Sequence, residues 1–498
     1  MGSDRRRTSD CYASQCPQAD ICKKNAAKDC GKISATFWDL WEKTRPAFRQ
    51  RRCWDKAGSL ALGQLLNFGR HTISRSIGSS GSGDRDWSAM YRLFERSRFE
   101  PAKVFDVALK ELEKEMDIKT PALAFIDDTL LKKSGRKVDG ASWRLDPLGP
   151  KFSNNFVWAQ RHMQISLACR EQNGRCRAIP VSLKHCPTAK KPGRKATESE
   201  LEEYKKLQKI QRLPLKASES IHDLRNRIDA GRNLIVVGDG GYTNASVCKN
   251  LPKNTDYIGR LRKNAALFSP PEQQNQGAGR KRFYGDALPT PEEFRSSNQN
   301  DWREVSAATG NGNHAFKIKS YTGIRSKIAG EQNLKMLIVQ PLRYRLTSRS
   351  RLLYRDPAYI ICTNPDIPDK DILQYYLWRW EIELNFKDEK SLLGIHEAQI
   401  RTKASSDNFP AFVASVYSIF MLACKKCFGD SHPVSYPKWR TTKTITRPST
   451  ASFIAKFRTE VISASIMNKS PFVTQTDKDT KPSFFQPDWK SVINYASY

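Results

Sequence analysis

Between residues 36 and 116, apolar residues recur mainly at the spacing of α-helices, and there is little strand signal. Residues 57–66 predict a short helix, residues 67–70 a turn, and residues 72–77 a second helix that carries Arg75. Two short helices around a glycine turn are typical of a helix-turn-helix, whose second helix enters the major groove of DNA. We therefore predict a small all-α DNA-binding domain, with Arg75 as a DNA contact.

Beyond residue 120 the pattern changes to that of β-strands. Residues 123–126 are all apolar and lead into Asp127 and Asp128. Apolar residues alternate with polar or small ones over residues 163–169 and again over 179–183, with the favoured hairpin turn Asn-Gly at 173–174 between them. This segment predicts one strand followed by a β-hairpin.

A helical segment and another buried strand follow the hairpin. Residues 197–230 are expected to be helical, with a break at Pro214. Residues 234–238 are an apolar run that ends at Asp239. Strand, hairpin, helix and strand in this order begin a ribonuclease-H-like sheet. The predicted fold class is therefore α/β, a ribonuclease-H-like mixed sheet with flanking helices.

The stretch from Tyr376 to Lys390 carries the most informative pattern. Tyr376, Arg379, Glu383 and Lys390 follow at steps of three, four and seven residues, which return to one side of an α-helix. At about 100° per residue, the four positions lie within roughly 60° of one another. A solvated face would also explain charged residues here, but the neighbouring positions are too aromatic for one. The pattern suits the binding of a metal ion and a phosphate chain.

Three acids are predicted to meet at one edge of the sheet. Asp128 ends the first strand, Asp239 ends a later one, and Glu383 projects from the helix that packs against them. Carboxylate oxygens are the ligands that Mg²⁺ prefers, and two such ions activate an attacking water or 3′-hydroxyl and stabilise the leaving oxygen. Taken alone, each acid could be a turn or cap residue, and Asp239 before two glycines would suit a turn well.

The spacing Tyr-x2-Arg-x3-Glu-x6-Lys resembles the Y-R-E-K signature of DDE transposases of bacterial insertion sequences. In that family Thr or Ser usually follows the first acid, which matches Asp128 before Thr129 and makes Asp127 the lesser candidate. The resemblance implies that Asp128, Asp239 and Glu383 bind two Mg²⁺ ions, for which Mn²⁺ can substitute. It further implies that Tyr376, Arg379 and Lys390 contact the DNA backbone.

The same resemblance implies a function and an organisation. The protein would bind the terminal inverted repeats of its element as double-stranded DNA, cut at each end, and join the freed ends to target DNA as a dimer on DNA. Members of this group carry a mostly β insertion between the second Asp and the Glu. The predicted units are a Cys-containing N-terminal segment (1–35), the helical DNA-binding domain (36–117), the catalytic core in two parts (118–240 and 372–430), the β-rich insertion (241–371) and a basic C-terminal tail (431–498) with one helix near 452–465.

The composition agrees with a polyanionic partner. The 498 residues include 84 Lys and Arg against 52 Asp and Glu, a formal net charge of +32, for which nucleic acid is the default partner. No run of 18 apolar residues and no secretory signal is found, so a cytoplasmic, DNA-associated protein without a membrane span is expected. Residues 409–424, the most apolar segment, are predicted to form a core helix.

The cysteines leave one question open. Cys11, Cys16, Cys22 and Cys30 could hold a structural zinc ion, although the paired Cys-x2-Cys arrangement is absent. Cys424 and Cys427 form a single such pair, on an apolar helix where packed, unreactive thiols are the better interpretation. Two other functions stay open as well: a nuclease of the same fold that cuts without strand transfer, and a non-catalytic DNA-binding relic of a transposase.

Overall fold

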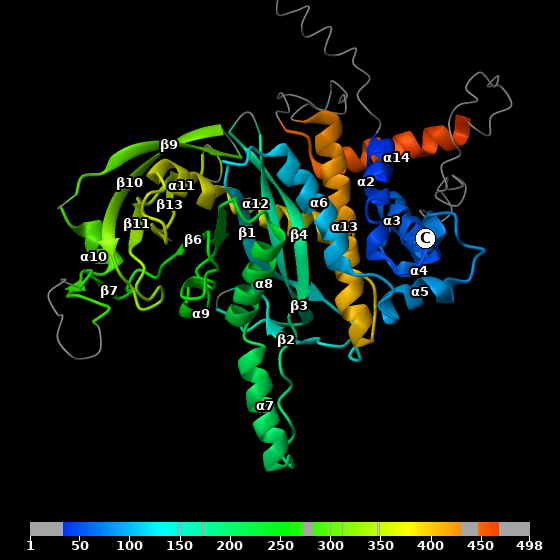
Figure 1. Cartoon of the computed structure of the whole chain (residues 1–498), viewed down its shortest axis with the longest axis horizontal. Coiled ribbons are helices and arrows are strands. Elements are labelled where there is room, and N and C mark those ends of the chain that lie inside the picture. Colours follow the sequence, from blue (N-terminus) through cyan, green and yellow to red (C-terminus); the bar gives the residue numbers. More distant parts are fainter. Residues whose placement is uncertain are drawn as a thin grey trace, which may run out of the picture.

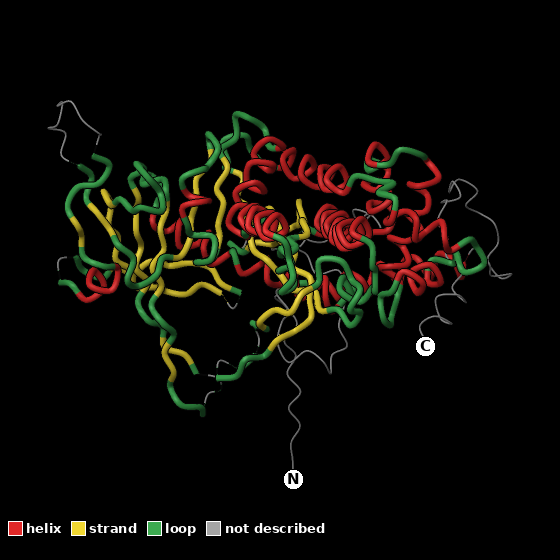
Figure 2. Tube along the Cα trace, turned by 90° about the horizontal axis from the view of Figure 1, so that it is seen from below, coloured by secondary structure: helices red, strands yellow, loops and turns green. Residues whose placement is uncertain are grey.

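The computed structural model describes residues 33–467 except 148, 151, 172–173, 272–281, 299, 311, 346, 348 and 430–446. The N-terminal cysteines, the Asn173 side of the predicted hairpin turn and most of the C-terminal tail therefore lie outside the described residues. The molecule is elongated, with strands gathered at one end and helices at the other (Figure 2).

The helical end is built from both halves of the chain. The first described part forms α2 (Ile33–Glu42), η1 (Arg45–Ala47), α3 (Arg51–Leu66), α4 (Ile73–Ser79), α5 (Trp87–Glu95) and α6 (Pro101–Glu115). Of these, α2, α3, α5 and α6 pack against α13 (Lys403–Phe428), which also lies on strand β4 (Cys176–His185) of the sheet, and α14 (Thr450–Met467) packs on α2 and α3 (Figure 1). Phe412 of α13 contacts the rings of Trp41, Phe94 and Phe99. The N-terminal helices thus share one core with a helix some 300 residues further along the chain.

Helix α13 is the predicted core helix. It is long and apolar enough to cross a membrane by length and composition, yet every residue from 408 to 424 is buried inside the fold. Cys424 is among them, and Cys427 lies with its Sγ 3.1 Å from the Thr36 hydroxyl. Both cysteines are therefore packing residues of the helical core, as their apolar surroundings indicated.

The sheet has ten strands in the order β2-β3-β1-β5-β6-β14-β11-β10-β9, with β4 also paired to β3. Strands β1, β5 and β6 are parallel, and the others are antiparallel to their neighbours. This is the mixed sheet that the alternating pattern predicted. Its strands are β1 (Ala122–Lys132), β2 (Ser142–Leu145), β3 (Phe156–Arg170), β4 (Cys176–His185), β5 (Leu234–Gly238), β6 (Thr255–Arg260), β9 (Arg303–Thr309), β10 (Gly312–Ile324), β11 (Leu334–Val339) and β14 (Ala358–Cys362).

The strands after β6 extend this sheet instead of forming a separate layer. β14 pairs with β6, and β11, β10 and β9 follow outward from it. Short hairpins, β7 (Leu267–Phe268) with β8 (Ala287–Leu288) and β12 (Arg343–Tyr344) with β13 (Leu353–Tyr354), and the helix α10 (Pro291–Ser296) lie in the connections between these strands, while α9 (Ala245–Cys248) connects β5 to β6. The residues expected to form a β-rich insertion are thus continuous with the core sheet.

Helices cover the two faces of the sheet around β1 and β5. Leu123, Phe125 and Val237 form one apolar cluster with residues of α11 (Asp369–Trp378) and α12 (Trp380–Ser391). Ala124 and Val236, which point to the other face, belong to the cluster that includes α8 (Leu213–Arg227). The faces differ because side chains alternate along each strand.

The helix between β4 and α8 stands away from the body. α7 (Glu198–Ile210) projects from the molecule and buries none of its residues (Figure 1). A capping box at Thr197 and Glu200 starts it, and Pro214 at the first turn of α8 marks the predicted break. Its stability therefore comes from local interactions rather than from packing.

The predicted helix-turn-helix corresponds to α3 and α4, which pack very closely. Gly63 of α3 lies against the Ser76 carbonyl of α4, and Ser76 Oγ donates to Gln64. Five of the seven residues of α4 are buried, which leaves Ser74 and Arg75 partly exposed. Both predicted helices are present, although α3 begins at Arg51 rather than at residue 57, and a DNA contact by Arg75 stays a prediction.

We expect Gly63→Ala to destabilise the protein by about 1–3 kcal/mol, because the added Cβ would lie 1.8 Å from the Ser76 carbonyl oxygen and the backbone would have to shift. Urea unfolding measures the change. Gly193→Ala is the matched control, since nothing lies within 4 Å of a Cβ at that position. Equal unfolding midpoints for the two variants would show that α3 and α4 do not pack as closely as described.

Candidate active site

Two neighbouring strands deliver two acids to the same face of the sheet. β1 and β5 run parallel in a register that pairs Ile126 with Gly238, so Asp127 and Asp239 are the next residues in step. Asp127 follows Phe125 and Asp239 follows Val237 at two-residue spacing, and both apolar residues face α12. Paired strands lie about 5 Å apart, so the two carboxyls are neighbours on the α12 side.

Asp128 points to the opposite face, which corrects its expected position. Tyr242 donates its hydroxyl to Asp128 Oδ1 at 2.6 Å, and Arg161 Nε lies 3.2 Å from Oδ2. Tyr242 belongs to the cluster on the α8 side, and the Asp128 carboxylate together with burial raises its pKa far above the ordinary range. The sequence interpretation favoured Asp128 over Asp127, but strand alternation puts Asp127 beside Asp239 and Asp128 away from it.

Helix α12 brings the third acid, and Arg379 joins it to the first. Arg379 Nη1 lies 2.9 Å from Asp127 Oδ2, and its Nη2 lies 3.0 Å from Glu383 Oε1. The guanidinium carbon is also 5.9 Å from the centre of the Tyr376 ring. Tyr376, Arg379 and Glu383 are three of the four residues predicted to share one side of a helix. They therefore lie together beside Asp127.

The helix predicted for residues 376–390 is interrupted between Tyr376 and Glu383. Instead of one continuous helix, α11 ends at Trp378 and α12 begins at Trp380, with Arg379 between them. Lys390, seven residues beyond Glu383, is about 10 Å further along the helix axis. Burial lowers the pKa of Lys390, and the charged groups that act on that pKa are Glu389, Lys132 and Asp146, none of them one of the three acids. Lys390 thus lies away from the three acids, while Arg75 lies on α4 beside His71.

The electrostatics of the site favour a cation. Burial raises the pKa of Asp127 to about 7; Arg379 opposes that rise, and Asp239 and Asp128 add to it. Although burial acts against its charge, the pKa of Arg379 is raised because Asp127, Tyr376 and Glu383 stabilise the cation. Removing one partner from a buried ion pair of this kind costs about 3–5 kcal/mol. Arg379 is therefore the counter-ion of the acids in this structure.

The donor set fits a hard divalent cation in its chemistry. Asp127 and Asp239 offer carboxylate oxygens side by side, and Glu383 offers a third across Arg379. Within the described ranges, however, no three His, Cys, Asp or Glu side chains are grouped closely enough to hold a metal ion. The acids are thus brought to one face, with the positive charge of Arg379 between Asp127 and Glu383.

A buried polar layer supports α12 against β3. Asn385 donates to the Ser166 hydroxyl at 3.1 Å, and the Tyr417 hydroxyl lies 3.3 Å from Asn385 Oδ1. Glu389 is also buried. The amide nitrogen of Gln164, in the orientation that satisfies both of its polar atoms, donates to the Glu389 carboxyl at 3.0 Å. Burial raises the pKa of Glu389 to about 8. These polar contacts link the helix that carries Glu383 to the central strands.

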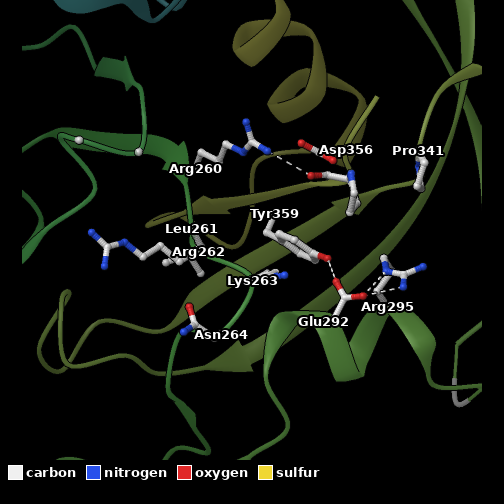
Figure 3. A pocket seen from close by; sticks show the side chains of 13 residues that line it. Arg260, Leu261, Arg262, Lys263, Asn264, Glu292, Arg295, Pro341, Asp356 and Tyr359 are labelled. Carbon is white, nitrogen blue, oxygen red and sulfur yellow. Dashed lines mark hydrogen bonds and ion pairs between the residues drawn. The ribbon is translucent and has the colours of Figure 1, made fainter. Parts of the chain in front are cut away.

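A basic pocket of about 810 Å³ opens directly after Asp239 (Figure 3). Gly240 and Gly241 are among its lining residues, and so is Tyr359, whose hydroxyl bonds to Glu292. Its charged lining residues are Arg260, Arg262, Lys263, Arg295, Glu292 and Asp356. These cations were not among the residues predicted from the sequence. The run Gly-Arg-Leu-Arg-Lys at 259–263 was the available signal, but its proximity to Asp239 depends on the pairing of β5 with β6.

The family comparison covers more than half of the chain. A family model described as DDE superfamily endonuclease matches residues 45–326. The match includes Asp127, Asp128 and Asp239, whereas Tyr376, Arg379, Glu383 and Lys390 lie beyond it. A comparison with curated proteins finds no significant match.

We expect Glu389→Gln to become more stabilising, relative to wild type, as the pH rises. The folded-state pKa of Glu389 lies above its unfolded value, so wild type loses stability from about pH 4.5 to about pH 8, at up to about 1.4 kcal/mol per pH unit. Glutamine does not titrate and removes this loss. Urea unfolding of both proteins at pH 5, 7 and 8.5 measures the difference, and a difference that stays constant with pH would contradict the buried, neutral state of Glu389.

Proposed function

Because the chain belongs to the DDE superfamily endonuclease family, we propose that it is a transposase of the Y-R-E-K group. It binds the terminal inverted repeats of an insertion sequence, cuts the DNA at both ends and transfers the freed strands to target DNA. Family membership supports a transposase-like nuclease. The observation that supports the finer proposal most is that Asp127 and Asp239 lie in step on one face, with Glu383 joined to them through Arg379.

We assign the metal-binding role to Asp127, Asp239 and Glu383. Their carboxylates would hold Mg²⁺, or Mn²⁺ in its place, and two such ions are the expected number. When bound, the metal supplies a more acidic water or 3′-hydroxyl and neutralises charge on the leaving oxygen. Asp128 is assigned a structural role, because Tyr242 and Arg161 occupy both of its oxygens on the other face.

The cationic and aromatic residues beside the acids suit a DNA phosphate. The Arg379 guanidinium offsets the repulsion between the carboxylates of Asp127 and Glu383 before the substrate binds. Its forked donors can bind a phosphate as well as a carboxylate. Tyr376 packs under that guanidinium and restricts where it can turn. Lys390 and Arg75 lie further out and would contact the DNA backbone away from the cut. Pairing of two element ends implies a dimer on DNA.

Cleavage assays with three variants test this assignment. On DNA that carries the sequences flanking the gene, we expect Asp127→Asn and Glu383→Gln to lower the Mg²⁺-dependent cutting rate by more than about 100-fold, because each removes a proposed metal ligand. Asp128→Asn is the matched control. It should change the rate by less than about tenfold, because asparagine keeps an oxygen for the Tyr242 hydroxyl. EDTA should abolish cutting by wild type.

The reaction products of wild type distinguish the candidate functions, and the relative cutting rates of the variants show which acids belong to the site. Joined products from wild type support transposition, and cutting without joining indicates the nuclease alternative. DNA binding without cutting in Mg²⁺ or Mn²⁺ indicates a relic of a transposase. A large loss in Asp128→Asn together with normal cutting by Asp127→Asn would show that the first acid of the site is Asp128 after all.

A further inference from the structure

The β12–β13 hairpin is unusually rich in arginine. Residues 341–357 contain five arginines and one acid, Asp356, whereas the whole chain has 84 basic against 52 acidic residues. Arg343, Arg345 and Arg355 are exposed on the described part of this hairpin. Arg355 lies 4.8 Å from the centre of the Tyr344 ring, which holds its guanidinium against the strand. The local excess of positive charge exceeds what the basic composition of the chain explains.

The base of this hairpin is also a wall of the basic pocket. Pro341, Asp356 and Pro357 line the pocket together with Gly240 and Gly241, which follow Asp239 directly. Arg260 donates to the Pro357 carbonyl at 3.2 Å (Figure 3). The pocket therefore connects the segment after Asp239 to the base of the arginine-rich hairpin. We call the cations of the pocket and the hairpin the basic surface, defined by Arg260, Arg262, Lys263, Arg343, Arg345 and Arg355.

The cations of the basic surface make no close ion pairs within the protein. Among the ion pairs of the described residues, none involves any of these six side chains, while Arg295 at the pocket wall is paired with Glu292. A hairpin with two residues in each strand is marginal by itself, and mutual repulsion among arginines weakens it further. Five of the six are arginines, whose planar forked donors bind phosphate oxygens in pairs. A polyphosphate ligand would explain the unpaired cations, the marginal hairpin and the predominance of arginine.

We propose that the basic surface binds the phosphodiester backbone of the DNA strand on the Asp239 side of the cleavage point. This inference rests on the proposed function for its choice of DNA as the polyphosphate. This binding depends on the charge and spacing of the phosphates rather than on base sequence, because the surface offers hydrogen-bond donors to phosphate oxygens. Its role is to hold the DNA in register with the acids, and its contacts add to affinity through release of counter-ions.

The test is the salt dependence of DNA binding by Arg262→Gln/Lys263→Gln/Arg343→Gln. A labelled duplex of arbitrary sequence is the probe, and its Kd is measured at several salt concentrations. Each lost phosphate contact lowers the slope of log K against log salt by about 0.9, so we expect the triple variant to lose about 3 and to bind at least about tenfold more weakly at low salt. None of these three side chains has an ion-pair partner among the described residues, so folding should persist.

Lys205→Gln/Lys206→Gln/Lys209→Gln on the exposed helix α7 is the control, because it removes the same charge from another surface. An unchanged slope in the Arg262 triple variant, or an equal loss in both variants, overturns the inference. If wild type cuts DNA while the Arg262 triple variant binds like wild type, only the basic surface is wrong. If binding depends on these residues but wild type never cuts, the basic surface binds DNA, the proposed function fails, and the placement relative to a cleavage point fails with it.

Discussion

The parallel pairing of β1 with β5 is the constraint on which the site depends. Its register sets Asp127 beside Asp239 on the face that α12 covers. A slip of one residue would turn each side chain to the other face and would exchange Asp127 for Asp128. The register is secured by buried residues on both faces of β1 and β5, since all residues from Ala122 to Ile126 and from Leu234 to Gly238 are buried. Packing thus decides which acid faces the helix.

Arg379 gives this arrangement its charge balance. Three acids at one sheet edge repel one another, and burial adds to the cost of their charges. The guanidinium contacts Asp127 and Glu383 directly and ties the helix to the central strand. The same group that stabilises the acids can later face a phosphate. Arg379 is on a long, flexible side chain. It can therefore stabilise the acids in the folded protein and could move aside if a metal ion bound them, as proposed.

The sequence located the central strands and the helical segment of α11 and α12 well, but it could not show which of Asp127 and Asp128 faces that segment. Residues 122–126 are apolar or small on both faces, so they show no alternation from which to read which acid faces the helix. The rule that threonine follows the first acid then favoured Asp128, and the strand register was invisible. Asp239 was easier to place, because one acid alone follows its strand.

Long-range contacts explain the other differences. The N-terminal helices were recognisable from their periodicity, whereas their shared core with Phe412 of α13 joins segments that no local pattern connects. Likewise, the arginines of residues 341–357 are visible in the sequence, but the meeting of their hairpin with the pocket after Asp239 requires β14 to pair with β6 and β6 with β5. Local patterns gave the elements, and packing of distant segments made the site.

The most direct test of the central claim is a crystal structure of the protein soaked with Mn²⁺, in which anomalous scattering locates the metal. The account predicts a peak within about 2–2.5 Å of carboxylate oxygens of both Asp127 and Asp239, with Asp128 still bonded to Tyr242. A peak bound by Asp128, with Asp127 remaining paired to Arg379, would contradict it.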